Sequence, residues 1–254
     1  MKITWSDLLS LTFFDLILIG VYGAFAMLLA PLTGYVLLTW VLVMTIAVIH
    51  LYFCCFSPLS IVLHGIRSTR MDRDREQVIY NKLVVWIPSL RTLQVHIVED
   101  VSVNLTIFRS HSTVHLLITD RFIEKLSGVH AESALCYMAQ IASHRRFYTH
   151  SVIMVLAVLL ERLKVTSILA ASVIHSFIPA PEDKIWDTKA AAIHGADTYC
   201  EIFKVIIQCM YKSSALPSAL SVISFSDISH GPLTYESMYA VHLAEMIRKN
   251  LLIP

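Results

Sequence analysis

The segment from Tyr35 to Phe56 reads YVLLTWVLVMTIAVIHLYFCCF and contains no Asp, Glu, Lys or Arg; His50 is its only basic side chain. A run of about 20 predominantly apolar residues is long enough to cross the hydrocarbon core of a bilayer. The sequence therefore predicts a transmembrane helix here.

A second apolar run precedes the first and extends from Leu8 to Ala30, interrupted by Asp15. Only the short segment Pro31–Gly34 separates the two runs. Consecutive elements joined by a short connection usually pack side by side. We therefore expect residues 1–66 to form a transmembrane helical hairpin with an uncharged tip.

The composition agrees with contact with lipid and excludes some classes of function. Hydrophobic residues make up 56% of the 254 residues and charged residues 15%, against about 45–50% and about 25% in soluble domains. A formal charge of +1 and the absence of a Lys/Arg-rich run exclude a nucleic-acid partner. The five cysteines form no CxxC pair, so the sequence does not predict a disulfide framework.

Basic residues flank the apolar pair on the side away from its tip. Lys2 comes before it, and Arg67, Arg70, Arg73 and Arg75 follow it. By the positive-inside rule, this distribution predicts an integral membrane protein with both ends and the main domain in the cytoplasm.

The remaining residues, 67–254, predict one mixed domain. The charged segment Met71–Asn81 is typical of a solvated helix, and Ala131–Phe147 has helical spacing of apolar residues. Three short β-prone segments lie between them: Leu93–Val98, Asn104–Phe108 and Thr113–Thr119. The fold class is therefore α+β, mainly α, with a small β-sheet.

The region 150–178 has more than one interpretation. Its apolar runs Ser151–Leu160 and Val165–Ile178 are each too short to cross a bilayer comfortably. A core helical hairpin, a pair of interfacial helices and one long tilted span all remain open. Further helices are expected over Asp183–Met210 and Tyr235–Lys249.

Three segments of the chain, taken together and in their order, resemble the pattern of a known family. Val95–Leu126 contains Asn104, a β-prone stretch and the run His115-Leu-Leu-Ile-Thr-Asp120. Cys136–His144 follows, and then Asp183-Lys-Ile-Trp-Asp187-Thr-Lys-Ala190, with Gly195 and His230-Gly-Pro-Leu further on. With the apolar hairpin, this layout resembles the membrane-bound zinc metallopeptidases of the M48 family, the HtpX type. The resemblance implies a zincin-like domain over residues 67–254.

The family's chemistry requires an HExxH helix, in which two histidines bind zinc and a glutamate takes a proton from zinc-bound water. The resemblance places Gln140 at the first histidine, Ile141 at the glutamate and His144 at the second histidine. Asp183 corresponds to the third ligand, and Asp187 to a carboxylate that orients a ligand histidine. An amide oxygen is a poor zinc ligand and an aliphatic side chain cannot accept a proton. We therefore expect a pseudopeptidase without a cofactor, any residual zinc being held by His144 and Asp183.

The leading hypothesis is that the old substrate groove binds another membrane protein or a polypeptide segment. In the family this groove follows the edge strand, and strand addition is a common mode of peptide binding. The resemblance therefore predicts a binding strand with a nearby asparagine, made of Asn104, Val114, His115, Leu116, Leu117 and Ile118.

Two alternatives compete with this hypothesis. In the first, the chain is a divergent active metallopeptidase in which His175, His194 or Glu132 replaces the missing groups. In the second, the resemblance is accidental and the chain is a regulatory or structural inner-membrane component of a transport or transfer apparatus. A helical segment from Val95 to Thr119 would favour the second.

Overall fold

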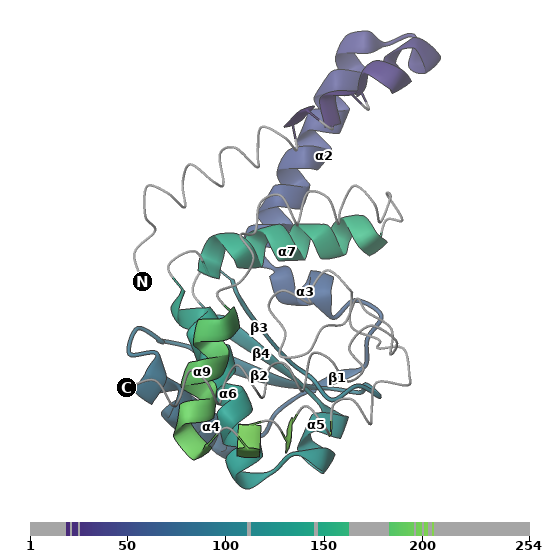
Figure 1. Cartoon of the computed structure of the whole chain (residues 1–254). Coiled ribbons are helices and arrows are strands. Elements are labelled where there is room, and N and C mark those ends of the chain that lie inside the picture. The colour runs from purple at the N-terminus through teal and green to yellow at the C-terminus, as the bar shows by residue number, and fades with distance from the viewer. Residues whose placement is uncertain are drawn as a thin grey trace.

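The computed structural model describes residues 19–20, 22–24, 26–110, 113–144, 147–162, 183–195, 197–199, 201–202 and 205. Over this part of the chain, a small mixed sheet lies between two layers of helices (Figure 1). The structure is thus α+β with mostly helix, which confirms the predicted class at that level.

The sheet has four described strands in the order β1-β2-β4-β3. Strand β2 pairs antiparallel with β1 and parallel with β4, and β4 pairs antiparallel with β3. Their bounds are β1 Ser68–Arg70, β2 Leu93–Val98, β3 Leu105–Arg109 and β4 Val114–Thr119. The three predicted strands are confirmed to within about one residue at each end. The described residues between 95 and 119 form strands and connecting loops, so the helix that would have favoured an accidental resemblance is not seen there.

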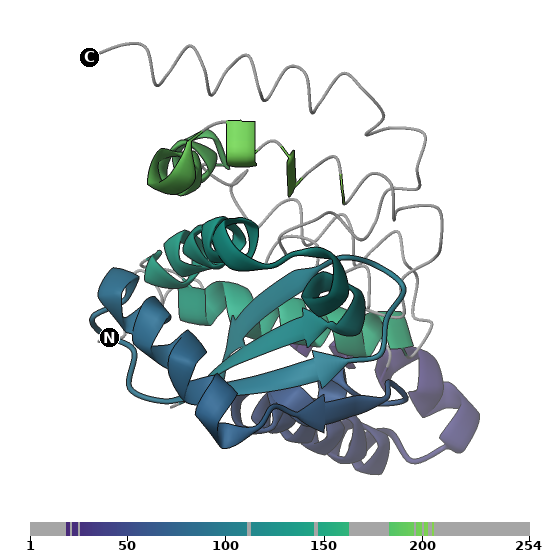
Figure 2. The ribbon, with the colours of Figure 1, turned by 90° about the horizontal axis from the view of Figure 1, so that it is seen from below.

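Helices cover both faces of the sheet (Figures 1 and 2). On one side lie α4 (Arg73–Trp86), α6 (Gly128–Ser143) and α9 (Asp183–His194), and on the other lie α3 (Pro58–Val62) and α7 (Phe147–Arg162). The short α5 (Asp120–Lys125) follows β4, and the Thr119 hydroxyl caps it by accepting from Phe122 N.

Local sequence explains where α4 starts and stops. The carboxylate of Asp72 accepts a hydrogen bond from Asp74 N at 3.3 Å, and Asp74 and Glu76 place negative charge in the first turn. The helix ends at Trp86, just before Ile87 and Pro88, because a proline disfavours helical geometry in the residue before it.

Helix α6 confirms the predicted apolar face, since Leu135, Met138, Ala139 and Ala142 are all buried. Its extent differs from the prediction of one helix over Ala131–Phe147. The helix stops at Ser143, and the C-cap residue His144 has an extended ψ of 137°. A second helix, α7, then begins at Phe147.

Helix α7 resolves part of the ambiguity of the region 150–178. Its residues from Val152 to Val158 are all at most 4% exposed, and the helix packs against β3 and α3. A helix buried all round belongs to a core. The second half of the region lies outside the described residues, so the structure places only α7, and the choice among the three arrangements of the whole region stays open.

The N-terminal apolar part contains α2 (Val36–Phe56), which coincides with the second predicted span. The residues just before it are helical up to Thr33, and the chain turns at Gly34, where φ is +69°. Gly23 lies so close to the Trp40 ring that an added Cβ would be 3.2 Å from Cη2. The Thr33 and Thr39 hydroxyls are 2.7 Å apart, so a hydrogen bond between them links the two sides of this turn.

Within the described residues, no helix meets the combined length and apolarity required of a membrane span. The first predicted span, Leu8–Ala30, lies largely outside those residues. So does the predicted helix Tyr235–Lys249, together with the turn at His230. The predicted helix from Asp183 is interrupted at Gly195, where φ is +91°.

Candidate functional site

The positions that match the peptidase motif lie at the C-terminal end of α6. Gln140 is half-buried, and its amide Nε2 lies 3.9 Å from Cys136 Sγ. Ile141 is 4% exposed and packs in the core. The ring of His144 stacks on the ring of His150 from α7, with centroids 5.5 Å apart. Packing and ring contacts thus account for these three side chains.

Helix α9 packs along α6 in the opposite direction. The C-terminal His194 of α9 lies beside Glu132 near the start of α6, with Nε2 and Oε2 3.4 Å apart. The other end of α9, at Asp183, is therefore directed toward His144. The side chains of Asp183 and Asp187, which the resemblance makes the third ligand and the orienting carboxylate, lie outside the described part of the chain.

The side chains that the structure describes do not assemble a metal centre, because no three His, Cys, Asp or Glu among them form a group able to hold an ion. Two of the residues proposed as replacements for the lost groups, Glu132 and His194, lie in contact with each other. Glu132 also forms an ion pair with Lys82. However, Glu132 precedes Gln140 by eight residues, or about 12 Å at ~1.5 Å per residue. His175 lies outside the described residues.

The predicted binding strand is not an edge in the described sheet. Strand β4 lies between β2 and β3, so both of its sides are paired. Of the six predicted binding residues, only Val114 is partly exposed; the other five are at most 6% exposed: Asn104, His115, Leu116, Leu117 and Ile118. The prediction that a partner adds a strand here is therefore wrong, because neither the backbone nor most of the side chains are accessible.

Asn104 has a structural role. Its Oδ1 accepts from Leu105 N at 2.8 Å, and its backbone N donates to the Thr119 hydroxyl at 3.0 Å. It thereby fixes the start of β3 to the end of β4.

Strand β3 is the described edge beyond β4, and α7 covers it. Asn104 O and Ser110 N bond toward β4, so the alternation of the ladder directs the amides of Leu105, Ile107 and Arg109 outward. Arg109 N donates to Ser151 Oγ of α7 at 2.9 Å, and Leu105 N to the Asn104 side chain. Two of the three outward amides are therefore already bonded.

Ser110 and His115 have the spacing of a nucleophile and base, with Oγ and Nε2 3.3 Å apart. Both are buried, and the Ser110 hydroxyl donates to Thr113 O at 3.1 Å. Cys136 is also no nucleophile candidate, since burial raises the pKa of its thiol more than the Gln140 amide lowers it. These groups fit structural roles.

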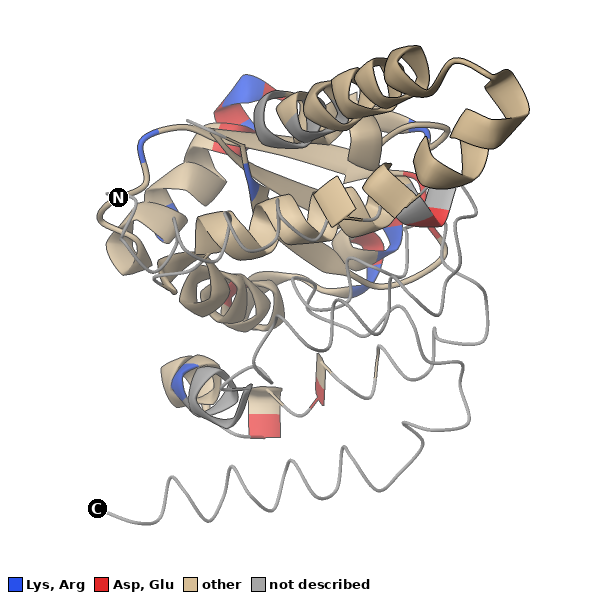
Figure 3. Ribbon diagram, turned by 90° about the horizontal axis from the view of Figure 1, so that it is seen from above, with Lys and Arg blue, Asp and Glu red and all other residues tan. Residues whose placement is uncertain are grey.

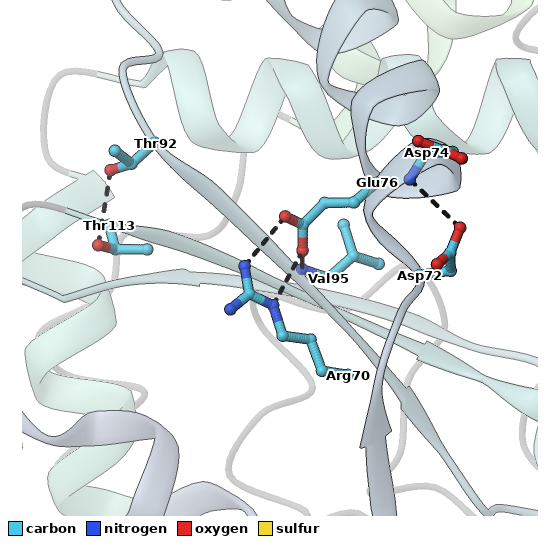
Figure 4. A network of polar contacts seen from close by, with 7 residues as sticks. All are labelled: Arg70, Asp72, Asp74, Glu76, Thr92, Val95 and Thr113. Atoms are coloured by element: carbon cyan, nitrogen blue, oxygen red, sulfur yellow. Dashed lines mark hydrogen bonds and ion pairs between the residues drawn. The ribbon is translucent and has the colours of Figure 1, made fainter.

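A polar network that was not predicted from the sequence joins β1, α4 and β2 (Figure 4). Glu76 accepts from Arg70 Nη2 at 3.1 Å and from Val95 N at 3.0 Å. Burial raises the pKa of the Glu76 carboxyl, but the hydrogen bonds from Arg70 and Val95 outweigh burial, so its pKa is lowered. The signal in the sequence was a glutamate in the first turn of a helix that directly follows a strand.

The most prominent exposed feature is apolar. Of the 18 exposed large apolar side chains among the described residues, 14 lie between Ile19 and Tyr52. No Asp, Glu, Lys or Arg occurs from residue 16 to residue 66, and Figure 3 accordingly shows no charged residue on α2. We call this surface the apolar hairpin surface.

Taken together, the structure defines a mainly helical α+β protein with a small mixed sheet and a large exposed apolar helix. Neither a protein-family model, a curated protein nor a solved structure matches this chain.

Proposed function

We propose that this chain is an integral membrane protein, anchored by its N-terminal hairpin, whose cytoplasmic sheet-and-helix domain acts by binding another protein and not by peptide hydrolysis. The proposed membrane anchoring is supported by the apolar hairpin surface. The proposal of a non-catalytic binding domain rests on Ile141 at the position of the base and on the resemblance to the M48 peptidases.

The exposed residues of α2 cover a wide arc. They come in neighbouring groups, Val36–Leu38, Val41–Leu42 and Val48–Ile49, between the buried Thr39, Val43 and Ala47. At 100° per residue, the exposed positions from Leu37 onward, with Ile46, span about half of the helix circumference. Fluid lipid covers an arc of this width more completely than a single partner helix would.

The energetics favour covering this surface. Burying one large apolar side chain stabilises by about 1.5–3 kcal/mol, so ten partly exposed ones amount to on the order of 10 kcal/mol. That is comparable with the whole stability of an ordinary domain, about 5–15 kcal/mol. Exposure of this surface to water would therefore be a major cost.

Flotation with phosphatidylcholine vesicles tests the anchoring. The full chain should float with the vesicles and resist extraction by alkaline carbonate. The double variant Ile46→Lys, Ile49→Lys, at two exposed positions near the middle of α2, should float poorly, since a charge at the centre of an inserted helix costs about 2.5–3.5 kcal/mol. Val78→Lys, Val85→Lys on α4 is the matched control, because both valines are also exposed. A wild-type chain that stays in the aqueous fraction would refute the anchoring.

The absence of peptidase chemistry is tested by the zinc content per chain, measured on protein purified in detergent without added metal or chelator. The comparison is the double variant His144→Ala, Asp183→Ala. We expect no stoichiometric zinc in either protein. Near-stoichiometric zinc that is lost in the variant, with proteolysis that a chelator abolishes, would instead establish a divergent peptidase.

The proposed partner is another membrane protein or a polypeptide segment near the bilayer, because the anchor confines the domain to that region. Crosslinking in the membrane from the exposed position Val85, with the buried Leu83 as the negative control, tests for such a partner on the α4 side.

A further inference from the structure

Two buried histidines lie side by side in the centre of the sheet. His96 on β2 and His115 on β4 are 9% and 6% exposed, and their ring centroids are 6.3 Å apart. His115 pairs in register with Gln94, and His96 with Leu117. Because residues in register share a face, the two imidazoles are diagonal neighbours on one face.

Hydrogen bonding determines which nitrogen of His115 carries its proton. The hydroxyl proton of Ser110 is donated to Thr113 O, so Ser110 Oγ accepts from His115 Nε2–H. His115 Nδ1 therefore holds a lone pair, is buried and has no hydrogen-bond partner among the described residues. A proton added there would create a buried cation without an acceptor.

The surroundings of both rings also disfavour positive charge. His96 is in register with Arg70 of β1, and like charges directly opposite each other in a sheet repel. Glu76 of α4 is the one described anion that acts on His96, and it is already bonded to Arg70 and Val95. His115 faces His96 and stacks on Phe108, with centroids 5.2 Å apart.

We propose that the His96–His115 pair is a proton-sensitive switch: the two rings resist protonation while they are buried, so mild acid favours an opened state in which they are exposed and charged, and it thereby loosens the packing of β1, β2 and β4. The inference does not depend on the proposed membrane anchoring, since the sheet is the same with or without lipid. Its consequence is that the domain responds to local acidification by opening at its centre.

The expected size of the effect follows from the folded and unfolded protonation equilibria. Burial, with a smaller contribution from His96, lowers the pKa of His115 from 6.5 to about 4. For His96, burial and then Arg70 lower the pKa, and Glu76 raises it. The pKa of His115 is lower in the folded chain than in the unfolded chain. The folded state therefore loses stability as the pH falls through 6.5, the unfolded value. For His115 alone, the unfolding equilibrium constant should rise about 30-fold between pH 7.5 and pH 5.

Amide hydrogen exchange of the full chain in detergent tests the switch, with exchange rates corrected for their intrinsic pH dependence. Protection of β2 and β4 should fall by about 30-fold from pH 7.5 to pH 5 in the wild type. The variant His115→Leu should show a much flatter dependence. His64→Gln is the control, because His64 is exposed and should leave the dependence unchanged. An unaltered dependence in His115→Leu would overturn the proposal.

A second measurement needs no variant, in case leucine at this position prevents folding. Deuterium exchange at the imidazole C2 position, followed by mass spectrometry on the wild type, reports the titration of each histidine. Titration of His115 below pH 5 supports the switch, and titration near pH 6.5 contradicts it.

Discussion

Replacing Glu76 should destabilise the domain far more than replacing an exposed glutamate. The Glu76 side chain is 12% exposed and accepts from Val95 N of β2, just beyond the end of the β1–β2 ladder, where Met71 N donates to Val95 O. Glu76→Ala removes the charged acceptor of Val95 N, which costs about 1.5–3 kcal/mol. The pair with Arg70 adds only about 0–1 kcal/mol, because Arg70 is 58% exposed. A loss of about 3 kcal/mol corresponds to a fall in Tm of roughly 6–12 °C for a domain of this size.

Glu124→Ala is the matched control. Glu124 forms an ion pair with Arg121 at 2.7 Å, but the two side chains are 53% and 44% exposed. An exposed pair of this kind contributes about 0.5 kcal/mol or less. Thermal unfolding of both variants in the same detergent, followed by tryptophan fluorescence, gives the comparison. Glu76→Gln should lose less than Glu76→Ala, since its amide oxygen still accepts from Val95 N.

The pH dependence gives an independent check. Because the pKa of Glu76 is lowered in the folded chain, its stabilising contribution is complete above the ordinary value of 4.5. It is lost as the pH falls through the lower folded value. The Tm difference between wild type and Glu76→Ala should therefore be largest above pH 4.5 and should shrink as the pH falls below that value. Equal losses for Glu76→Ala and Glu124→Ala at neutral pH, or a Tm difference that grows as the pH falls below 4.5, would refute the reasoning.

Three further substitutions test the packing around the sheet. Ser151→Ala should lower the free energy of unfolding by about 1–3 kcal/mol, because Arg109 N loses its acceptor; Thr113→Ala, which removes an exposed hydroxyl, should cost much less in the same denaturation experiment. Asn104→Ala should cost a similar 1–3 kcal/mol, since it leaves Leu105 N without its bond; an unchanged urea midpoint would contradict the role assigned to Asn104. Ala190→Leu should cost about 1–3 kcal/mol by overpacking the contact between α6 and α9, whereas Lys189→Leu, at an exposed neighbour, should not.

The sheet could be predicted because its signal is local. Short β-branched runs such as Leu105–Arg109 alternate with turn residues, and this pattern indicates strands without knowledge of their partners. The order of the strands has no such local signal. The sequence placed Val114–Ile118 at an edge, whereas the ladder encloses this strand between β2 and β3.

The extents of helices were less predictable than their existence. The apolar spacing around Met138 correctly indicated α6, but nothing in it marked the break at His144, where the backbone becomes extended. The buried polar contacts also could not be predicted from the sequence. The bond from Arg109 N to Ser151 joins residues 42 positions apart, and such pairing depends on tertiary packing that periodicity does not encode.

The cover over β3 bears on how the proposed binding domain would recognise a partner. A peptidase of the type that the chain resembles needs a base and also an open strand edge that holds the substrate extended. The resemblance places the buried Ile141 at the position of the base, and Ser151 and Asn104 already accept from outward amides of β3. Strand addition would have to break these bonds and displace α7, whose side chains from Val152 to Val158 are buried in the core. The other edge strand, β1, is only three residues long and offers few backbone groups for strand addition. The proposed partner should therefore be recognised mainly through exposed side chains. Backbone N-methylation of a bound segment should accordingly leave its affinity unchanged, whereas changes to its side chains should not.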